Sequence, residues 1–173
     1  YKEFMTDIAE EIERENKIIT DLLSLVKMDK TSANLNIENR NLNELIELIL
    51  KRLRPIAKQR NIDVLYESAR EVFAEIDEVK LTLAISNLVE NAIKYNNEYG
   101  YVKVSLDADH QFATIMVEDN GIGIPQEAQE HIFERFYRVD KSHSREIGGT
   151  GLGLAIARNA ILLHRGSIKI DSE

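Results

Sequence analysis

The first thirty residues carry the pattern of one long amphipathic helix. Apolar residues recur there at spacings of three, four and seven, and charged residues fill the other face. The apolar positions are Phe4, Ile8, Ile12, Ile19, Leu22, Leu23 and Val26. A lone helix of this kind would leave its apolar stripe in water, so we expect it to pack in a helical hairpin or a dimeric bundle. The polar segment 29–34 interrupts the pattern, and we expect a domain boundary there.

The rest of the chain alternates between strand and helix patterns. Strands are predicted at 35–40, 62–66, 72–76, 101–106, 113–118 and 167–171. Helices are predicted at 41–59, 78–95, 126–137 and 151–164. Pro55 should kink or loosen the first of these helices, and the segment 107–111 should close a β-hairpin. The order predicts an α+β domain with one mostly antiparallel sheet and helices on one face.

Composition and charge exclude several classes of protein. The 173 residues, 43% of them hydrophobic, suffice for one domain with a sizeable core and an appendage. A net charge of −8 argues against a nucleic-acid partner, because such binding rests on Lys and Arg neutralising phosphates. The absence of cysteine excludes disulfides and thiolate metal sites and favours a cytoplasmic location. The chain starts at Tyr1 without a signal-peptide pattern, so we expect it to come from the middle of a longer protein.

Six of the eight glycines fall in two short clusters, and the first cluster follows a predicted strand. Asp119 stands at the end of that strand, where its carboxylate could accept a hydrogen bond from the exocyclic amine of adenine. Gly121 and Gly123 let the backbone approach a ligand closely, and Ile122 or Ile124 could pack on a flat base. A plain β-turn is the alternative, because Asp-Asn-Gly suits a turn, although a bare turn does not require the second glycine.

The second cluster, at 148–153, leads directly into a predicted helix. It lacks the Lys-Ser/Thr of a phosphate-binding P-loop and the spacing of a dinucleotide-binding fingerprint. Its exposed backbone N–H groups and the helix N-terminus nevertheless favour an anion, and Thr150 could add a hydroxyl donor. A flexible hinge is an alternative that is compatible with this interpretation.

Polar residues share one face of the predicted helix 78–95. Asn87, Asn91 and Lys94 are spaced i, i+4 and i+7, with Glu90 at the edge of the same face. Such groups are costly to bury without partners. Amide oxygens are hard ligands that suit Mg²⁺, and an ammonium suits phosphate. This face is therefore either a magnesium–phosphate site or an ordinary solvated helix face.

Between the first loop and the second glycine cluster lies an aromatic segment. Phe133 and Phe136, three residues apart, should anchor one helix face by core packing, while Arg138 points elsewhere. The polar stretch 139–147 that follows has the character of an active-site lid. Arg138, at the base of this lid, is a candidate for phosphate contact.

In order and spacing, these four motifs resemble the ATP-binding catalytic domain of sensor histidine kinases, in the gyrase–Hsp90–histidine kinase–MutL superfamily. The Asn-bearing helix resembles the N box, the Asp119 loop the G1 box, residues 133–138 the F box and residues 149–153 the G2 box. The resemblance covers residues 35–173. The first helix, residues 1–31, resembles the second helix of the family's dimerisation and histidine-phosphotransfer hairpin. The implied fold is a two-layer α/β sandwich of the Bergerat type, preceded by one long helix.

The resemblance also implies site residues. The catalytic set would be Asn87, Asn91, Lys94 and Arg138, with Asn91 as the ligand of Mg²⁺. The nucleotide-binding set would be Asn87, Asn91, Lys94, Tyr95, Asp119, Gly121, Gly123, Ile124, Arg138, Gly149, Thr150, Gly151, Leu152 and Gly153. Asn87 stands at the position we assign to the water-activating glutamate of the ATP-hydrolysing relatives, which fits transfer to a histidine rather than hydrolysis.

The implied activity is that of a protein-histidine kinase in two-component signal transduction. It would use ATP and Mg²⁺ and pass the phosphoryl group to a histidine for relay to a response regulator. None of the four histidines, His110, His131, His143 and His164, has the surroundings of the phosphoacceptor. We therefore expect a fragment that lacks the acceptor and its last strand and cannot phosphorylate itself alone, from the cytoplasmic part of a membrane-anchored kinase. The expected partners are ATP, the acceptor hairpin, a response regulator and a second copy paired through the first helix. The alternative is a nucleotide-binding, dimerising interaction module without kinase activity.

Overall fold

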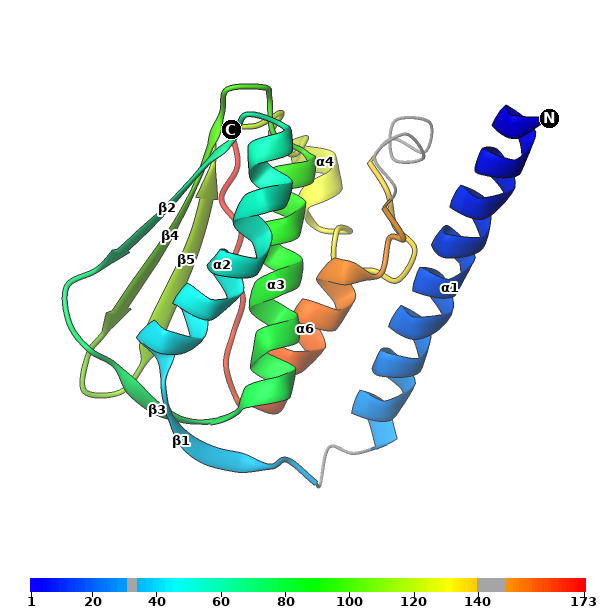
Figure 1. Cartoon of the computed structure of the whole chain (residues 1–173). Coiled ribbons are helices and arrows are strands. Elements are labelled where there is room, and N and C mark those ends of the chain that lie inside the picture. Colours follow the sequence, from blue (N-terminus) through cyan, green and yellow to red (C-terminus); the bar gives the residue numbers. More distant parts are fainter. Residues whose placement is uncertain (31–33, 140–148) are drawn as a thin grey trace.

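The computed structural model describes residues 1–30, 34–139 and 149–173 (Figure 1). In these ranges the helices are α1 (Lys2–Lys30), α2 (Leu42–Gln59), α3 (Glu78–Lys94), α4 (Gln126–Gln129) and α6 (Gly153–Leu163). The strands there are β1 (Ile37–Asn41), β2 (Asp63–Ser68), β3 (Phe73–Asp77), β4 (Tyr101–Ala108) and β5 (Ala113–Asp119). Gly148, His143, most of the predicted lid and the centre of the predicted boundary lie outside the described residues.

The long helices form where the periodicity predicts them. Asn41 caps α2, and its Oδ1 accepts hydrogen bonds from the backbone N–H groups of Asn43 and Glu44. One face of α2 is buried in the core, and the helix continues through Pro55 to Gln59, so the proline does not end it. Among the described residues, none of the helices combines the length and the apolar character that a membrane span requires.

The strands of the described chain form two sheets rather than the single one predicted. β2 pairs in parallel with β4, and β4 pairs antiparallel with β5 in the predicted hairpin. β1 and β3 form a separate antiparallel pair. Helices α2 and α3 cover one face of the three-stranded sheet, with α6 packed on α3 (Figure 1). The main core lies between them and includes Ile46, Val89 and Val104, each completely buried or nearly so.

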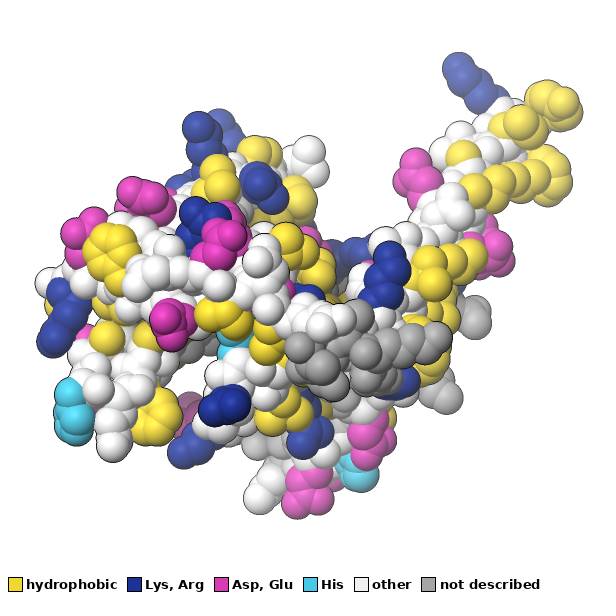
Figure 2. Space-filling model, turned by 90° about the horizontal axis from the view of Figure 1, so that it is seen from below, with side chains coloured by type: hydrophobic (Ala, Val, Ile, Leu, Met, Phe, Trp, Pro, Cys, Tyr) yellow, Lys and Arg dark blue, Asp and Glu magenta, His cyan; other side chains and the backbone are white. Residues whose placement is uncertain are grey.

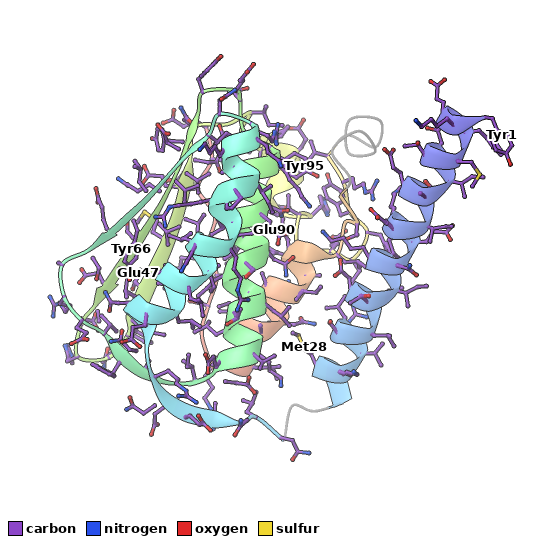
Figure 3. All side chains as sticks on the ribbon, viewed as in Figure 1. Tyr1, Met28, Glu47, Tyr66, Glu90 and Tyr95 are labelled. Carbon is purple, nitrogen blue, oxygen red and sulfur yellow. The ribbon has the colours of Figure 1, made fainter. Side chains whose placement is uncertain are left out.

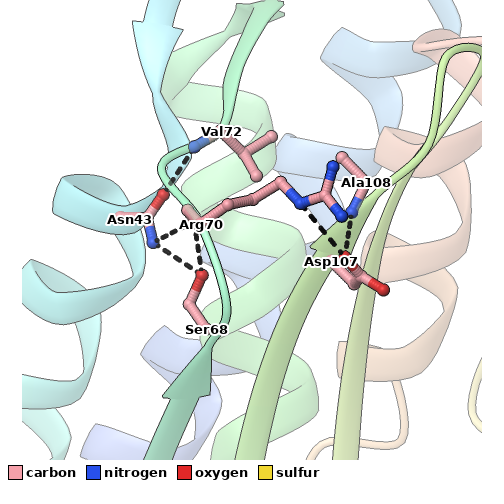
Figure 4. A network of polar contacts seen from close by, with 6 residues as sticks. All are labelled: Asn43, Ser68, Arg70, Val72, Asp107 and Ala108. Carbon is pink, nitrogen blue, oxygen red and sulfur yellow. Dashed lines mark hydrogen bonds and ion pairs between the residues drawn. The ribbon is translucent and has the colours of Figure 1, made fainter.

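A polar network explains why β2 and β3, although consecutive in the chain, belong to different sheets (Figure 4). The Asn43 side chain accepts from the Val72 backbone N–H at 2.8 Å and donates to the Ser68 hydroxyl at 2.8 Å and to the Arg70 carbonyl oxygen at 3.2 Å. The Arg70 guanidinium also lies 3.7 Å from the Asp107 carboxylate. These contacts fasten the β2–β3 connection to the start of α2, so the two strands leave it toward different partners.

Two other predictions fail in the second half of the chain. The helix predicted over 126–137 ends at Gln129, and residues 130–136 form turns. Phe136 has φ of 65°, a left-handed conformation that no α-helix can contain, and its ring is exposed instead of anchoring a helix face. Residues 167–171 form no strand in this structure. The chain beyond them lies against the loop after β5, where the Ile124 N–H donates to the Ser172 hydroxyl at 2.8 Å.

Among the described residues, helix α1 packs on the rest of the chain mainly through its C-terminal half. Leu25 and Met28 are buried in a second cluster with residues of α6, while Ile18 and Leu22 pack at its edge. The residues toward the N-terminus remain exposed, and Figure 2 shows their hydrophobic side chains on the projecting part of the helix. The exposed large apolar residues of this segment are Tyr1, which precedes α1, and Phe4, Met5, Ile8, Ile12, Ile19, Leu23 and Val26 of the helix. Most of the predicted apolar stripe therefore still faces water, and its pairing with another helix stays a prediction.

Candidate functional site

Helix α3 contacts both glycine loops of the candidate site. Asp77 caps its start, with one carboxylate oxygen 3.1 Å from the Lys80 backbone nitrogen. His164 fixes the same end, because its Nε2 accepts the Asp77 N–H at 3.0 Å while its Nδ1 donates to the Ala160 carbonyl oxygen. The apolar face of α3 is buried, and its polar face carries Asn87, Asn91 and Lys94, all half-buried. Figure 3 shows Glu90 and Tyr95 along this helix.

The loop after β5 meets the C-terminal end of α3. The Tyr95 carbonyl oxygen accepts the Ile122 N–H at 3.2 Å. A Cβ placed on Gly121 would lie 2.4 Å from that same oxygen, so only glycine permits this approach. Gly123 has φ of 72°, which also favours glycine. Both glycines therefore lie close to protein atoms in this structure, and the predicted approach of the backbone to a ligand stays a prediction.

Asp119 is the last residue of β5 and is exposed. Its Oδ1 accepts the Gly121 N–H at 2.8 Å, the Asp-x-Gly turn that the sequence allowed. An ionised carboxylate has about four acceptor positions, so Asp119 keeps capacity for a further donor. Ile124 is placed differently: together with Ile122, Pro125, Gln129 and Ser172 it lines an open pocket that includes none of the polar side chains of α3.

The glycine-rich loop lies against the other part of α3. A Cβ on Gly153 would lie 2.8 Å from Asn87 Oδ1, so Gly153 lets the start of α6 pack directly on that asparagine. Gly151 has φ of 76°, and its carbonyl oxygen accepts the Phe136 N–H at 2.9 Å. Leu152 is completely buried, and no side chain in the described ranges caps α6. The N-terminus of α6 is therefore available to an anion.

Arg138 lies against this loop and is already hydrogen-bonded to it, and its predicted contact with phosphate stays a prediction. Its guanidinium Nη2 donates to the Gly149 carbonyl oxygen, and the residue is half-buried. The aromatic segment before it is held partly by Phe133, whose ring centroid lies 5.8 Å from the Arg158 guanidinium carbon. The structure thus joins the F-box-like segment to the glycine-rich loop through Phe136 and Arg138.

Two residues of α1 that the sequence analysis did not assign to the site, Lys17 and Asp21, also reach it. Thr150 is 6% exposed, and its hydroxyl donates to Asp21 of α1 at 2.8 Å. The Lys17 ammonium lies 4.0 Å from the Glu90 carboxylate. Asp21 and Lys17 are four residues apart on α1 and so share a helix face, but the sequence carries no signal of what that face contacts.

Burial lowers the pKa of Lys94, and the neighbouring ammonium of Lys17 lowers it further. The carboxylates of Glu90 and Asp21 act in the opposite direction without restoring the ordinary value. A half-buried cation of this kind is poorly compensated, which favours an arriving anion. The amides of Asn87 and Asn91, this ammonium and the uncapped start of α6 form a donor set that fits a magnesium–phosphate group.

Comparison with known proteins agrees with this geometry. Residues 76–173 match the family described as histidine kinase-, DNA gyrase B-, and HSP90-like ATPase. The sensor histidine kinase WalK of Bacillus subtilis is 38% identical over 172 residues, which cover 98% of this chain and 28% of that protein. The sensor histidine kinase RppB of Synechocystis is 41% identical over 160 residues, 92% of this chain and 35% of that protein.

Solved structures of histidine kinases are also similar to this chain. The catalytic domain of histidine kinase ThkA is 31% identical with a TM-score of 0.65, over 73% of this chain and 80% of that one. ThkA in complex with the response regulator protein TrrA is 27% identical with a TM-score of 0.73, over 95% of this chain and 45% of that one. The chain belongs to the histidine kinase-, DNA gyrase B-, and HSP90-like ATPase family. Within that family it contains the ATP-binding catalytic domain of a sensor histidine kinase, and it spans about a third or less of the length of the curated relatives named above.

Proposed function

We propose that this chain binds Mg-ATP across α3, between the loop 119–124 and the glycine-rich loop 149–153, and transfers the γ-phosphoryl group to a histidine outside the chain. The observation that supports this most is the junction of both loops on one helix. Tyr95 holds the first loop and Asn87 contacts the second. Eight residues separate them, about 12 Å along an α-helix, so a ligand lying on α3 can contact both loops.

The base and the phosphates would occupy opposite ends of this face. Asp119 would accept a hydrogen bond from the adenine amine, with Gly121, Gly123 and Ile124 beside the base and Tyr95 lining the cleft. The phosphates would meet Lys94, Arg138 and the loop residues Gly149, Thr150, Gly151, Leu152 and Gly153. Arg138 would first have to leave the Gly149 carbonyl oxygen.

Asn91 would hold Mg²⁺, with Asn87 nearby on the same face. The ion, when bound, would supply charge neutralisation on the phosphate oxygens. The residues of the chain then do the positioning that a loose phosphoryl-transfer transition state requires. A bond forms between the acceptor histidine nitrogen and the γ-phosphorus, the bond to the bridging oxygen breaks, and ADP leaves with that electron pair. The attacking ring nitrogen uses its lone pair, and the proton on the other ring nitrogen of that histidine passes to solvent.

The wider assignments belong to the same proposal. Residues 1–31 would be the second helix of the acceptor hairpin, and residues 35–173 the catalytic domain. Because ThkA has been solved with a response regulator, we propose a response regulator as the final phosphoryl acceptor in the parent protein of this chain. The chain would act in the cytoplasm as part of that larger kinase.

Transfer to a separate acceptor tests the proposal. The chain is mixed with Mg²⁺, γ-labelled ATP and a hairpin bearing the phosphoacceptor histidine, and label on the hairpin is measured. We expect label on that hairpin and none on a control hairpin in which the acceptor histidine is glutamine. Measurable ATP binding without label on the acceptor would contradict the kinase assignment.

One observation favours the second candidate, a dimerising module that binds nucleotide without transferring phosphate. The exposed apolar residues of α1, among them Phe4, Ile8 and Ile12, form an unpartnered face. The same experiment separates the two functions, because the module would bind ATP and leave the acceptor hairpin unlabelled.

A further inference from the structure

The contact between α1 and the glycine-rich loop uses a group that the phosphates would need. The Thr150 hydroxyl has one hydrogen to donate, and in this structure Asp21 Oδ2 accepts it at 2.8 Å. The same oxygen of Thr150 accepts the Leu152 N–H at 3.3 Å, which fixes the turn into α6. While Asp21 is in place, this donor cannot serve an ATP phosphate.

The negative charge of Asp21 also opposes the binding of phosphate. Its carboxylate lies close enough to Lys94 to influence the ammonium, and Lys17 and Glu90 complete the charged group around it. A phosphate approaching Lys94 would be repelled by the carboxylates of Asp21 and Glu90. Lys17 offsets part of this repulsion, but it is itself 4.0 Å from Glu90, where the ion pair holds α1 against α3.

Apolar packing links the docking of α1 to the conformation of the glycine-rich loop. Leu25 and Met28 of α1 share a cluster with Leu152, Ala155 and Ile156. Leu152 is completely buried and stands two residues from Thr150. The loop therefore cannot rearrange around a phosphate without disturbing the packing of α1.

We propose that docked α1 opposes nucleotide binding, because Asp21 competes with the ATP phosphates for Thr150 and Lys94. This inference rests on the proposed nucleotide site. Linkage makes the effect reciprocal: bound nucleotide weakens the docking of α1 on the glycine-rich loop. Movement of α1 away from the loop would then raise the ATP affinity of the catalytic domain, so the position of the helix would regulate it.

Calorimetric titration of the whole chain with Mg²⁺ and a non-hydrolysable ATP analogue tests the inference. Asp21→Ala should bind the analogue about fivefold more tightly than the wild type, the effect of one lost competing hydrogen bond. Asp7→Ala makes the same change on the exposed half of α1, about 21 Å away along the helix, and should leave the affinity unchanged. Asp21→Asn, which keeps an acceptor for Thr150 but removes the charge, should give a smaller gain.

Each outcome is decisive. Unchanged or weaker binding by Asp21→Ala, with an Asp7→Ala control like the wild type, overturns the competition. Absence of binding by the wild type and by Asp21→Ala alike overturns the proposed nucleotide site and this inference with it. In a second measurement, hydrogen exchange of residues 17–28 should quicken when the analogue saturates the wild type. Slower or unchanged exchange there would overturn the reciprocal effect.

Discussion

The two glycine loops that flank α3 are fastened by different parts of the chain. The loop 119–124 is held by the end of α3 through Tyr95 and by the C-terminal segment through Ser172. The glycine-rich loop 149–153 is held by Phe136, by Asn87 and also by Asp21 of α1. The base end of the candidate site, at the loop 119–124, is thus built entirely within residues 35–173. The phosphate end, at the loop 149–153, is also hydrogen-bonded to the first helix. Changes in α1 should consequently affect the phosphate end and spare the base end.

The largest effect is expected at the base end. Asp119→Ala removes a carboxylate that would accept the adenine amine, and hydrogen bonds to charged groups contribute about 1.5–3 kcal/mol. We expect about a hundredfold weaker ATP binding by calorimetry, with the fold retained by circular dichroism. Asp109→Ala, the same change in the turn between β4 and β5, should bind like the wild type. Equal affinities for Asp119→Ala and Asp109→Ala would refute the adenine assignment.

A pair of glycine substitutions compares the two loops directly. Gly121→Ala places a Cβ 2.4 Å from a backbone oxygen, so the backbone must shift, and we expect a loss of about 1–3 kcal/mol in the free energy of unfolding. Gly153→Ala meets the movable Asn87 side chain at 2.8 Å and should cost less than about 1 kcal/mol. Urea denaturation measures both. A larger loss for Gly153→Ala than for Gly121→Ala would contradict the described packing of the two loops.

The start of α3 should respond to acid. Burial would raise the pKa of Asp77, but the backbone N–H groups of Lys80 and Asn36 and the Lys80 ammonium outweigh it and hold the pKa below its ordinary value. A folded-state pKa below the unfolded one gives stability at neutral pH that is lost as the pH falls below about 4 toward the folded pKa. We expect Asp77→Asn to lower the free energy of unfolding by about 1–2 kcal/mol at pH 7.

Urea denaturation between pH 7 and pH 3 measures this contribution. The Asp77→Asn chain should lose less stability over that range than the wild type does, because the titrating group is gone. The prediction fails if the two chains lose stability equally.

The smallest effect is expected from Lys17 at the phosphate end. Burial first and Lys17 second lower the pKa of Lys94, so its charge is lost at a lower pH than for an ordinary lysine. ATP affinity should therefore fall as the pH rises toward the folded pKa, while the ammonium deprotonates. In the Lys17→Gln variant, the pH at which half of this ATP affinity is lost should be higher than in the wild type. Calorimetry from pH 7 to 10 measures it. Lys2→Gln, at the exposed end of α1, is the control and should leave that pH unchanged.

Periodicity located α2 and α3 because each buries an apolar face, as with Leu42, Ile46 and Ile49 of α2. Glycine placement likewise indicated the two loops, since the conformations of Gly123 and Gly151 depend on glycine. What the sequence could not predict depends on contacts between distant residues. The side-chain hydrogen bonds of Asn43 direct β2 and β3 to different partner strands. The helix predicted over 126–137 cannot continue through Phe136, whose backbone is left-handed. The contact of Asp21 with Thr150 joins residues 129 positions apart, and no local pattern marks it.

Hydrogen exchange of the two loops tests the central claim most directly, namely that they form one nucleotide site. The whole chain is compared with and without Mg²⁺ and a non-hydrolysable ATP analogue, and the exchange of residues 119–124 and 149–153 is followed. Slower exchange in both loops, with no change in the β2–β3 connection at 69–72, is the result that this structure predicts. Protection confined to one loop, or absent from both at saturating analogue, would contradict it.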